Sequence, residues 1–292
     1  MPPSDRSPQD ISVELDRFLD QLVGRPPYAD ALTGRGVVSA WYGDTAGTPF
    51  WTRDADAPHY AASTMKLPLL VAAYRRADRG ELDLSAEVTV HNRFASAADG
   101  SVFSLDRAED QDDQTWAALG GRVTLGELAE RAVVHSGNLA TNLLLERVGV
   151  GEMAQVLVEA GCSTDTVLVR GIEDTVARDS GFDNLVTSAD LATVMVAVAA
   201  RSLAADSTCA EIERVLSRQR HRDKIPAGLP PDTYVANKTG WVDGVAHDVA
   251  LVRPASGEAY VLAVCTTLAV PEPAANALIA GISRAVWTAH TA

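Results

Sequence analysis

Short apolar runs of β-type composition lie near both ends of the chain, and this arrangement constrains the fold most strongly. Residues 36–42 are strand-like and are followed by a second such stretch at 49–51. Three further runs occupy 234–237, 249–252 and 260–265. Helical patterns fill the region between the two groups. We therefore predict an α+β fold, in which both chain ends build one antiparallel sheet with flanking helices, and an all-helical region is inserted between them.

The length of the chain favours a single domain. With 292 residues it can bury an ample core, and neither an internal repeat nor a linker divides it. We predict one catalytic domain over residues 1–292. Its α/β region is expected at about 11–62 and 202–292, and its helical region at about 63–201.

Composition and charge narrow the classes of function. Hydrophobic residues make up 47% and charged residues 22%, as in a soluble globular enzyme, and the formal net charge is −14. This negative charge argues against nucleic acid and anionic membrane surfaces as partners. Three widely spaced cysteines fit no metal-ligand pattern and no nucleotide motif is present, so we predict neither a metal nor a cofactor. We expect a monomer that acts on a small molecule.

The sequence also carries a prediction of location. No basic segment is followed by an apolar run, as it would be in a signal peptide. No apolar run reaches the ~18 residues of a membrane span. The protein is predicted to be cytoplasmic as written, or secreted if a leader has been removed from the sequence.

The first candidate for chemistry is Ser63-Thr64-Met65-Lys66, which is followed at once by an apolar run at 69–73. If this stretch is helical, Ser63 and Lys66 share one face, and Ser63 lies at the positive end of the helix. A serine hydroxyl needs a base to become a nucleophile, and Lys66 is close enough to serve directly or through a water. The alternative is a helix-capping serine with an ordinary surface lysine, since this pattern is common by chance.

Two further motifs strengthen the functional interpretation of the first. Ser136-Gly137-Asn138 lies in a turn between two predicted helices, and Lys238-Thr239-Gly240 ends an apolar strand. In this order and setting, the three motifs resemble those of the penicillin-recognising serine enzymes, most closely the class A β-lactamases. The resemblance extends over nearly the whole chain.

The resemblance implies an activity and a set of roles for the first half of a reaction. Ser63 attacks a carbonyl and forms an acyl-enzyme, with Lys66 as base. The backbone N–H groups of Ser63 and Trp241 stabilise the oxyanion, and Ser136 relays a proton to the leaving nitrogen. The expected substrate is an anionic amide or a β-lactam.

The resemblance also implies how the substrate is held. Asn138 is expected to bind the amide of the substrate's side chain. Lys238 and Thr239 are expected to bind its carboxylate through charge-assisted hydrogen bonds, with Gly240 beside them.

Two departures from the family pattern affect these expectations. Gly137 stands where the family usually has aspartate, so a carboxylate that stiffens the turn is lost. The family's deacylating glutamate lies in Arg-x-Glu-x-x-Leu-Asn, whereas here Glu173 comes one residue later and no Leu-Asn follows it. We predict that Glu173 activates the hydrolytic water. The alternative is a loop carboxylate paired with Arg170 or Arg178.

The departures leave other functions open. Without a deacylating base, the protein would be a slow esterase or a covalent binder of β-lactams, and a different amide or ester could be its substrate. His247 and Asp248 are neighbours in a strand, so their side chains are expected on opposite faces rather than in one catalytic pair. The stretch 222–224 is predicted to be a solvated turn, while Phe103 and Trp116 either line the cleft or pack the long polar segment 92–121.

Overall fold

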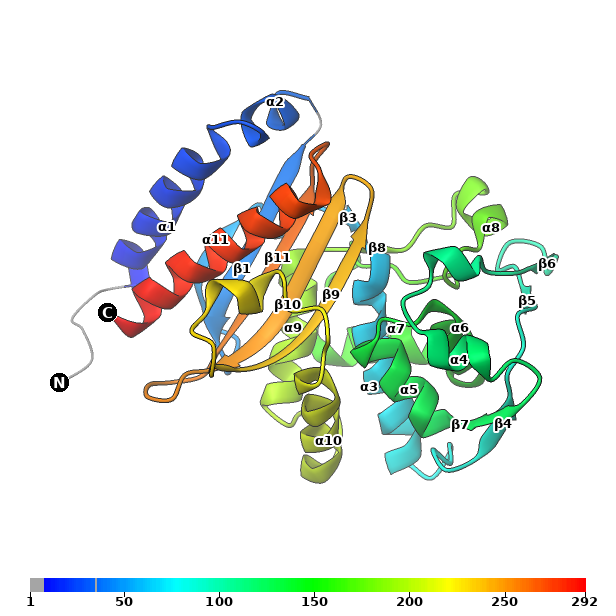
Figure 1. Ribbon diagram of the computed structural model, residues 1–292. Coiled ribbons are helices and arrows are strands. Elements are labelled where there is room, and N and C mark those ends of the chain that lie inside the picture. Colours follow the sequence, from blue (N-terminus) through cyan, green and yellow to red (C-terminus); the bar gives the residue numbers. More distant parts are fainter. Residues whose placement is uncertain (1–7, 35) are drawn as a thin grey trace.

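The computed structural model describes residues 8–34 and 36–292 and centres on a five-stranded antiparallel sheet (Figure 1). The strand order is β2-β1-β11-β10-β9. The strands are β1 (Val37–Asp44), β2 (Pro49–Arg53), β9 (Tyr234–Val242), β10 (Val245–Arg253) and β11 (Tyr260–Thr267). The first two come from the start of the chain and the other three from its end. The predicted α+β architecture is confirmed.

Alternation along β11 assigns its residues to two separate cores. Leu262 and Val264 belong to the core under α1 (Pro8–Val23) and α11 (Glu272–Thr291). Ala263 and Cys265 point the other way and join the larger core, which includes α9 (Ser188–Ala199). Figure 1 shows α1 and α11 together on one face of the sheet. Both faces are covered, which explains why this strand is a continuous apolar run.

The helical region surrounds α3 (Lys66–Asp78), in which every residue from 66 to 73 is buried. Neighbouring helices enclose α3 on several sides, and the residues of its first two turns, 67–73, are all apolar. These neighbours are α5 (Leu125–Val134), α6 (Asn138–Val148), α7 (Val150–Ala160) and α10 (Asp206–Ser217). A helix buried in this way holds its first residues rigidly, and these include Lys66.

Several short elements complete the chain. The helical ones are α2 (Tyr28–Leu32), α8 (Thr175–Asp179) and the 3₁₀ turns η1 (Ala62–Met65) and η3 (Ile225–Gly228). The extended ones are β3 (His59–Tyr60), β4 (Glu87–Thr89), β7 (Arg122–Thr124) and β8 (Leu185–Val186). No helix in the described part of the chain is both long and apolar enough to cross a membrane.

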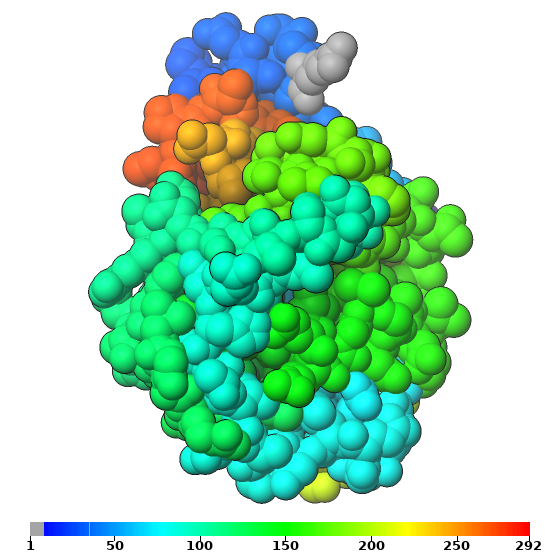
Figure 2. Space-filling model, turned by 90° about the vertical axis from the view of Figure 1, so that its right-hand side faces the viewer, coloured from blue at the N-terminus to red at the C-terminus, as the bar shows by residue number. Residues whose placement is uncertain are grey.

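The segment 92–121, predicted as a long polar loop, contains short elements of its own. They are β5 (Phe94–Ala95), β6 (Val102–Phe103), η2 (Arg107–Glu109) and α4 (Asp113–Ala117). Each is too short to leave a hydrophobic period in the sequence. Trp116 is buried, and its indole N–H donates to Asp110 Oδ2 at 2.8 Å. It therefore packs the segment instead of lining a cleft. Figure 2 shows this segment, in cyan to blue-green, across the front of the molecule.

Candidate active site

Ser63 lies in η1, one turn before the start of α3, close to the predicted helix start. The backbone of β9 approaches this turn closely at Gly240. A Cβ atom at Gly240 would lie 3.0 Å from the backbone nitrogen of Ser63 and 2.9 Å from that of Thr64. Only glycine permits this approach. It brings Trp241, the next residue of β9, to the same cleft as Ser63, as the predicted pair of oxyanion donors requires.

Lys66 is fully buried, which excludes the alternative of an ordinary surface lysine. Its Nζ donates to the carbonyl oxygen of Ser136 and to Oδ1 of Asn138, both at 2.8 Å. Burial lowers the pKa of Lys66 to about 7, and the charges of Asp110 and Glu173 partly offset that lowering. Lys66 is therefore neutral in a substantial fraction of molecules near pH 7 and can accept a proton.

Lys238 is the second buried lysine of the site and converges on the same serine. Its Nζ donates to Ser136 Oγ at 3.1 Å and to the carbonyl of Thr239 at 2.6 Å. Burial lowers the pKa of Lys238 well below its ordinary value, and the nearby charge of Lys66 lowers it further. Ser136 has φ +59°, a left-handed conformation that is unusual for serine. The hydroxyl of Thr239 is buried and has no hydrogen-bond partner among the described residues.

Glu173 lines the same cleft as Ser63, with φ +61°. Its Oε2 accepts the backbone N–H of Asp106 at 2.8 Å, while Oε1 is buried and without a partner among the described residues. Burial raises the pKa of Glu173, and the hydrogen bond from Asp106 acts in the opposite direction. The preceding Ile172 is held by Asn142 of α6, whose side chain bonds its N–H at 2.8 Å and its carbonyl at 2.9 Å. These contacts fix the loop that presents Glu173.

The alternative pairing of Glu173 with an arginine is not observed. Arg170 is buried and bonds Asp183 at 2.7 Å, while the exposed Arg178 bonds Asp179 at 3.2 Å. Both arginines are therefore engaged elsewhere. The carboxylate of Glu173 faces the cleft without a cationic partner among the ion pairs of the described residues.

A cleft of about 950 Å³ brings together the predicted residues that come from distant parts of the sequence. Its walls include Ser63, Ser136, Asn138, Glu173 and Trp241, and Lys66 and Lys238 are hydrogen-bonded to this wall from behind. The lining of the cleft also includes residues 241–245 and 268–272, where the apolar side chains of Val242, Val245 and Val270 lie near Asp243 and Glu272 in the sequence.

The burial of Lys224 beside the site was not predicted from the sequence. Lys224 falls in the stretch predicted as a solvated turn, yet it is 1% exposed, and its Nζ lies 4.9 Å from the centre of the Trp241 ring. Its charge also contributes to the lowered pKa of Lys238. One sign of this burial is present in the sequence: Lys224 directly precedes the apolar residues of η3, which begins at Ile225.

The prediction for His247 and Asp248 is confirmed. His247 Nε2 lies 2.8 Å from the carbonyl of Tyr60 on one face of β10. Asp248 accepts from Asn237 and from the N–H of Ile225, both at 3.0 Å, on the other face. They do not form a catalytic pair.

A serine on a helical turn, with two buried lysines that meet at a second serine, defines a site for acyl transfer through a serine ester. The sequence model of the Beta-lactamase enzyme family matches residues 29–290. The chain belongs to this family.

Known proteins resemble the chain in sequence and in fold. A β-lactamase of Mycobacterium tuberculosis is 27% identical over 224 residues, which span 72% of this chain and 66% of that protein. The crystal structure of a β-lactamase from Sphaerobacter thermophilus is 25% identical, with a TM-score of 0.76 over 94% of this chain and 96% of that one. A mutant of PBP-A, in an acyl-enzyme complex with penicillin G, is 25% identical with a TM-score of 0.75, over 95% and 96% of the two chains.

Proposed function

We propose that the protein hydrolyses β-lactams through an acyl-enzyme on Ser63, with Glu173 as the base for deacylation. The observation that carries this proposal is the convergence of Lys66 and Lys238 on Ser136, beside the cleft that Ser63 lines. One chain supplies every group named here, so the proposed reaction needs no second subunit, and we propose that the protein acts as a monomer on a small molecule.

In acylation, Ser63 Oγ forms a bond to the lactam carbonyl carbon and its proton passes to neutral Lys66. The N–H groups of Ser63 and Trp241 hold the oxyanion. Collapse of the tetrahedral intermediate breaks the C–N bond. Ser136 passes its hydroxyl proton to the leaving nitrogen and regains one from protonated Lys66, which becomes neutral again. Lys238 donates to Ser136 Oγ and keeps that hydroxyl in place for the transfer.

In deacylation, a water attacks the ester carbon and gives its proton to Glu173. The unpartnered Oε1 supports this role, because a buried oxygen without a partner can accept from a water. The ester C–O bond then breaks, and the Ser63 oxygen takes the proton from Glu173, which becomes a carboxylate again. The raised pKa of Glu173 brings its basicity closer to that suited to neutral pH.

The test is time-resolved intact mass spectrometry after mixing with benzylpenicillin, together with nitrocefin turnover. We expect an adduct on Ser63 that forms and decays, and no adduct with Ser63→Ala. Substitution Glu173→Gln should leave adduct formation intact and prolong its lifetime. Absence of both adduct and turnover in the unaltered protein would refute the proposal.

A second candidate is a serine amidase or penicillin-binding protein that deacylates slowly. The volume of the cleft, about 950 Å³, favours it, because a compact bicyclic lactam needs less space. A stoichiometric burst without further turnover would identify this second function.

A further inference from the structure

Gly137, the residue that departs from the family motif, is in contact with Asp112 of the distant segment 92–121. A Cβ atom at Gly137 would lie 2.7 Å from the Cβ of Asp112 and 3.1 Å from its Oδ2. The backbone of Gly137 has φ −64° and ψ 125°, which any residue can adopt. Lack of space, not backbone conformation, therefore requires glycine here.

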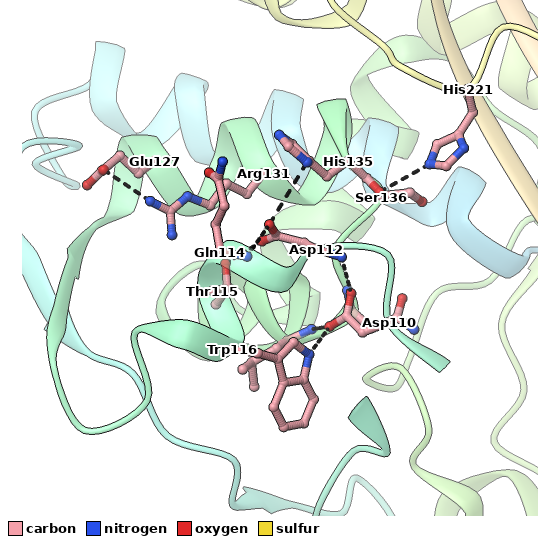
Figure 3. Close-up of polar contacts among 12 residues, drawn as sticks. Asp110, Asp112, Gln114, Thr115, Trp116, Glu127, Arg131, His135, Ser136 and His221 are labelled. Carbon is pink, nitrogen blue, oxygen red and sulfur yellow. Dashed lines mark hydrogen bonds and ion pairs between the residues drawn. The ribbon is translucent and has the colours of Figure 1, made fainter. Parts of the chain in front are cut away.

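The carboxylate of Asp112 is fully buried and satisfied by its surroundings (Figure 3). Oδ1 accepts the N–H of Gln114 at 3.1 Å, and Oδ2 accepts the hydroxyl of Thr115. His135 Nδ1, at the end of α5, lies 4.0 Å from Oδ1. Asp112 thus fills the space beside the Ser136–Asn138 turn with a carboxylate, although residue 137 has no side chain.

A second carboxylate, that of Asp110, binds the start of α6. Its Oδ1 accepts the N–H of Asn138 and its Oδ2 that of Leu139, both at 2.8 Å. Oδ1 also accepts the N–H of Asp112 at 3.1 Å, and Oδ2 that of the Trp116 indole at 2.8 Å. Gly137, the N-cap residue of α6, has no side chain to cap the helix. Asp110 supplies the cap from another part of the chain.

The same segment contacts residues proposed for acylation and for deacylation. The carbonyl of Glu109 accepts from Asn138 Nδ2 at 3.2 Å, and Asn138 Oδ1 accepts from Lys66. Four residues earlier in the segment than Asp110, the N–H of Asp106 binds Glu173. Residues 106–112, which we call the acidic segment, therefore contact Asn138 on one side and Glu173 on the other.

We propose that the acidic segment replaces the missing aspartate of the second motif: Asp112 occupies its space, and Asp110 positions Asn138 and Lys66 for acylation. Both are positioning residues that act through the turn and through α6. This inference rests on the proposed function and adds two residues to it.

The negative charge of Asp110 also affects the pKa of Lys66. The charged groups that interact with Lys66 are Asp110, Glu173 and Lys238. The negative charge of Asp110 keeps the pKa of Lys66 higher than burial alone would set it. Removing that charge lowers the pKa, so Lys66 remains neutral down to a lower pH.

The first experiment exchanges the two residues. Asp112→Gly and Gly137→Asp are made singly and together, and Asp113→Gly is the matched control, because its side chain is 91% exposed. Acylation by benzylpenicillin is followed by rapid-mix mass spectrometry, and unfolding midpoints are measured. We expect each single change to slow acylation about tenfold or more and the double variant to recover to within about threefold of the unaltered protein.

Additive losses in the double variant would overturn the pairing of residues 112 and 137. If the unaltered protein forms no adduct at all, the proposed function fails instead. In that event the recovery of the unfolding midpoint in the double variant still tests the exchange.

The second experiment uses Asp110→Asn, which keeps the size of the side chain, removes its charge and replaces one of its two acceptor oxygens by an N–H₂ group. We expect slower acylation near pH 8 and an acid limb of the pH profile that moves to lower pH. A structural role alone would lower the rate at every pH without moving the limb. An unmoved limb would refute the positioning of Lys66 by Asp110.

Discussion

The pH dependence of acylation is the sharpest test of the site, because it depends on the protonation of a single buried amine. In the proposed acylation step, only the neutral form of Lys66 can take the proton of Ser63. With a pKa of about 7, the neutral fraction is about one half at pH 7 and roughly a tenth at pH 6. An unperturbed lysine, with a pKa of about 10.4, would be neutral in only about one molecule in 2,500 at pH 7.

The expected profile of the acylation rate therefore rises about tenfold per pH unit below pH 6 and levels above pH 8. Stopped-flow nitrocefin acylation with Glu173→Gln isolates this step from deacylation. Because Glu173 also raises the pKa of Lys66, the limb in that variant should lie at lower pH than in the unaltered protein.

Lys66→Ala tests whether Lys66 is the group whose titration lowers the acylation rate at acidic pH. It should lower the acylation rate by about 10² to 10⁴, the usual contribution of a general base. A flat profile between pH 5 and 8, or near-normal acylation by Lys66→Ala, would show that another group is the base.

Three further predictions follow from packing and geometry. Gly240→Ala places a methyl group 2.9 Å from the Thr64 nitrogen, so it should displace the Ser63 turn and lower stability by about 1–3 kcal/mol, with slower acylation in the same mass-spectrometric assay. Leu70→Ala, in the fully buried part of α3, should cost about 2–5 kcal/mol in denaturant unfolding. Lys224→Met should weaken inhibition by anionic competitors, and this effect should grow smaller with increasing salt; equal inhibition in both proteins would exclude Lys224 from anion binding.

Much of the fold was predictable because its pattern is local. Residues of β11 alternate between two cores, so this strand is a continuous apolar run in the sequence. Residues 67–73 of α3 are also all apolar, which indicates a buried helix. The three motifs also appear in order. Their meeting in one cleft followed from the family resemblance, since no property of Ser136 alone points to Lys238.

The contacts of the segment 92–121 could not be predicted in the same way. Its elements are short, and its important contacts are to residues far along the chain, such as Asp110 to Asn138 and Asp106 to Glu173. The burial of Lys224 was missed for a similar reason, because a charged residue in a turn is usually solvated. From the sequence, Gly137 indicated that the aspartate of the family motif is lost. In the structure, the carboxylate of Asp112, from another segment, lies beside Gly137.

The two buried lysines of the site make substrate binding a protonation event as well. In the free protein, burial lowers the pKa of both Lys66 and Lys238, and the charge of Lys66 adds to the effect on Lys238. A substrate carboxylate beside Lys238 would reverse part of this shift, so binding of an anion draws a proton from the solvent. The measured binding heat should then depend on the ionisation enthalpy of the buffer, and affinity for anions should fall as the pH rises. The charge of this site therefore depends on the bound ligand as well as on the pH.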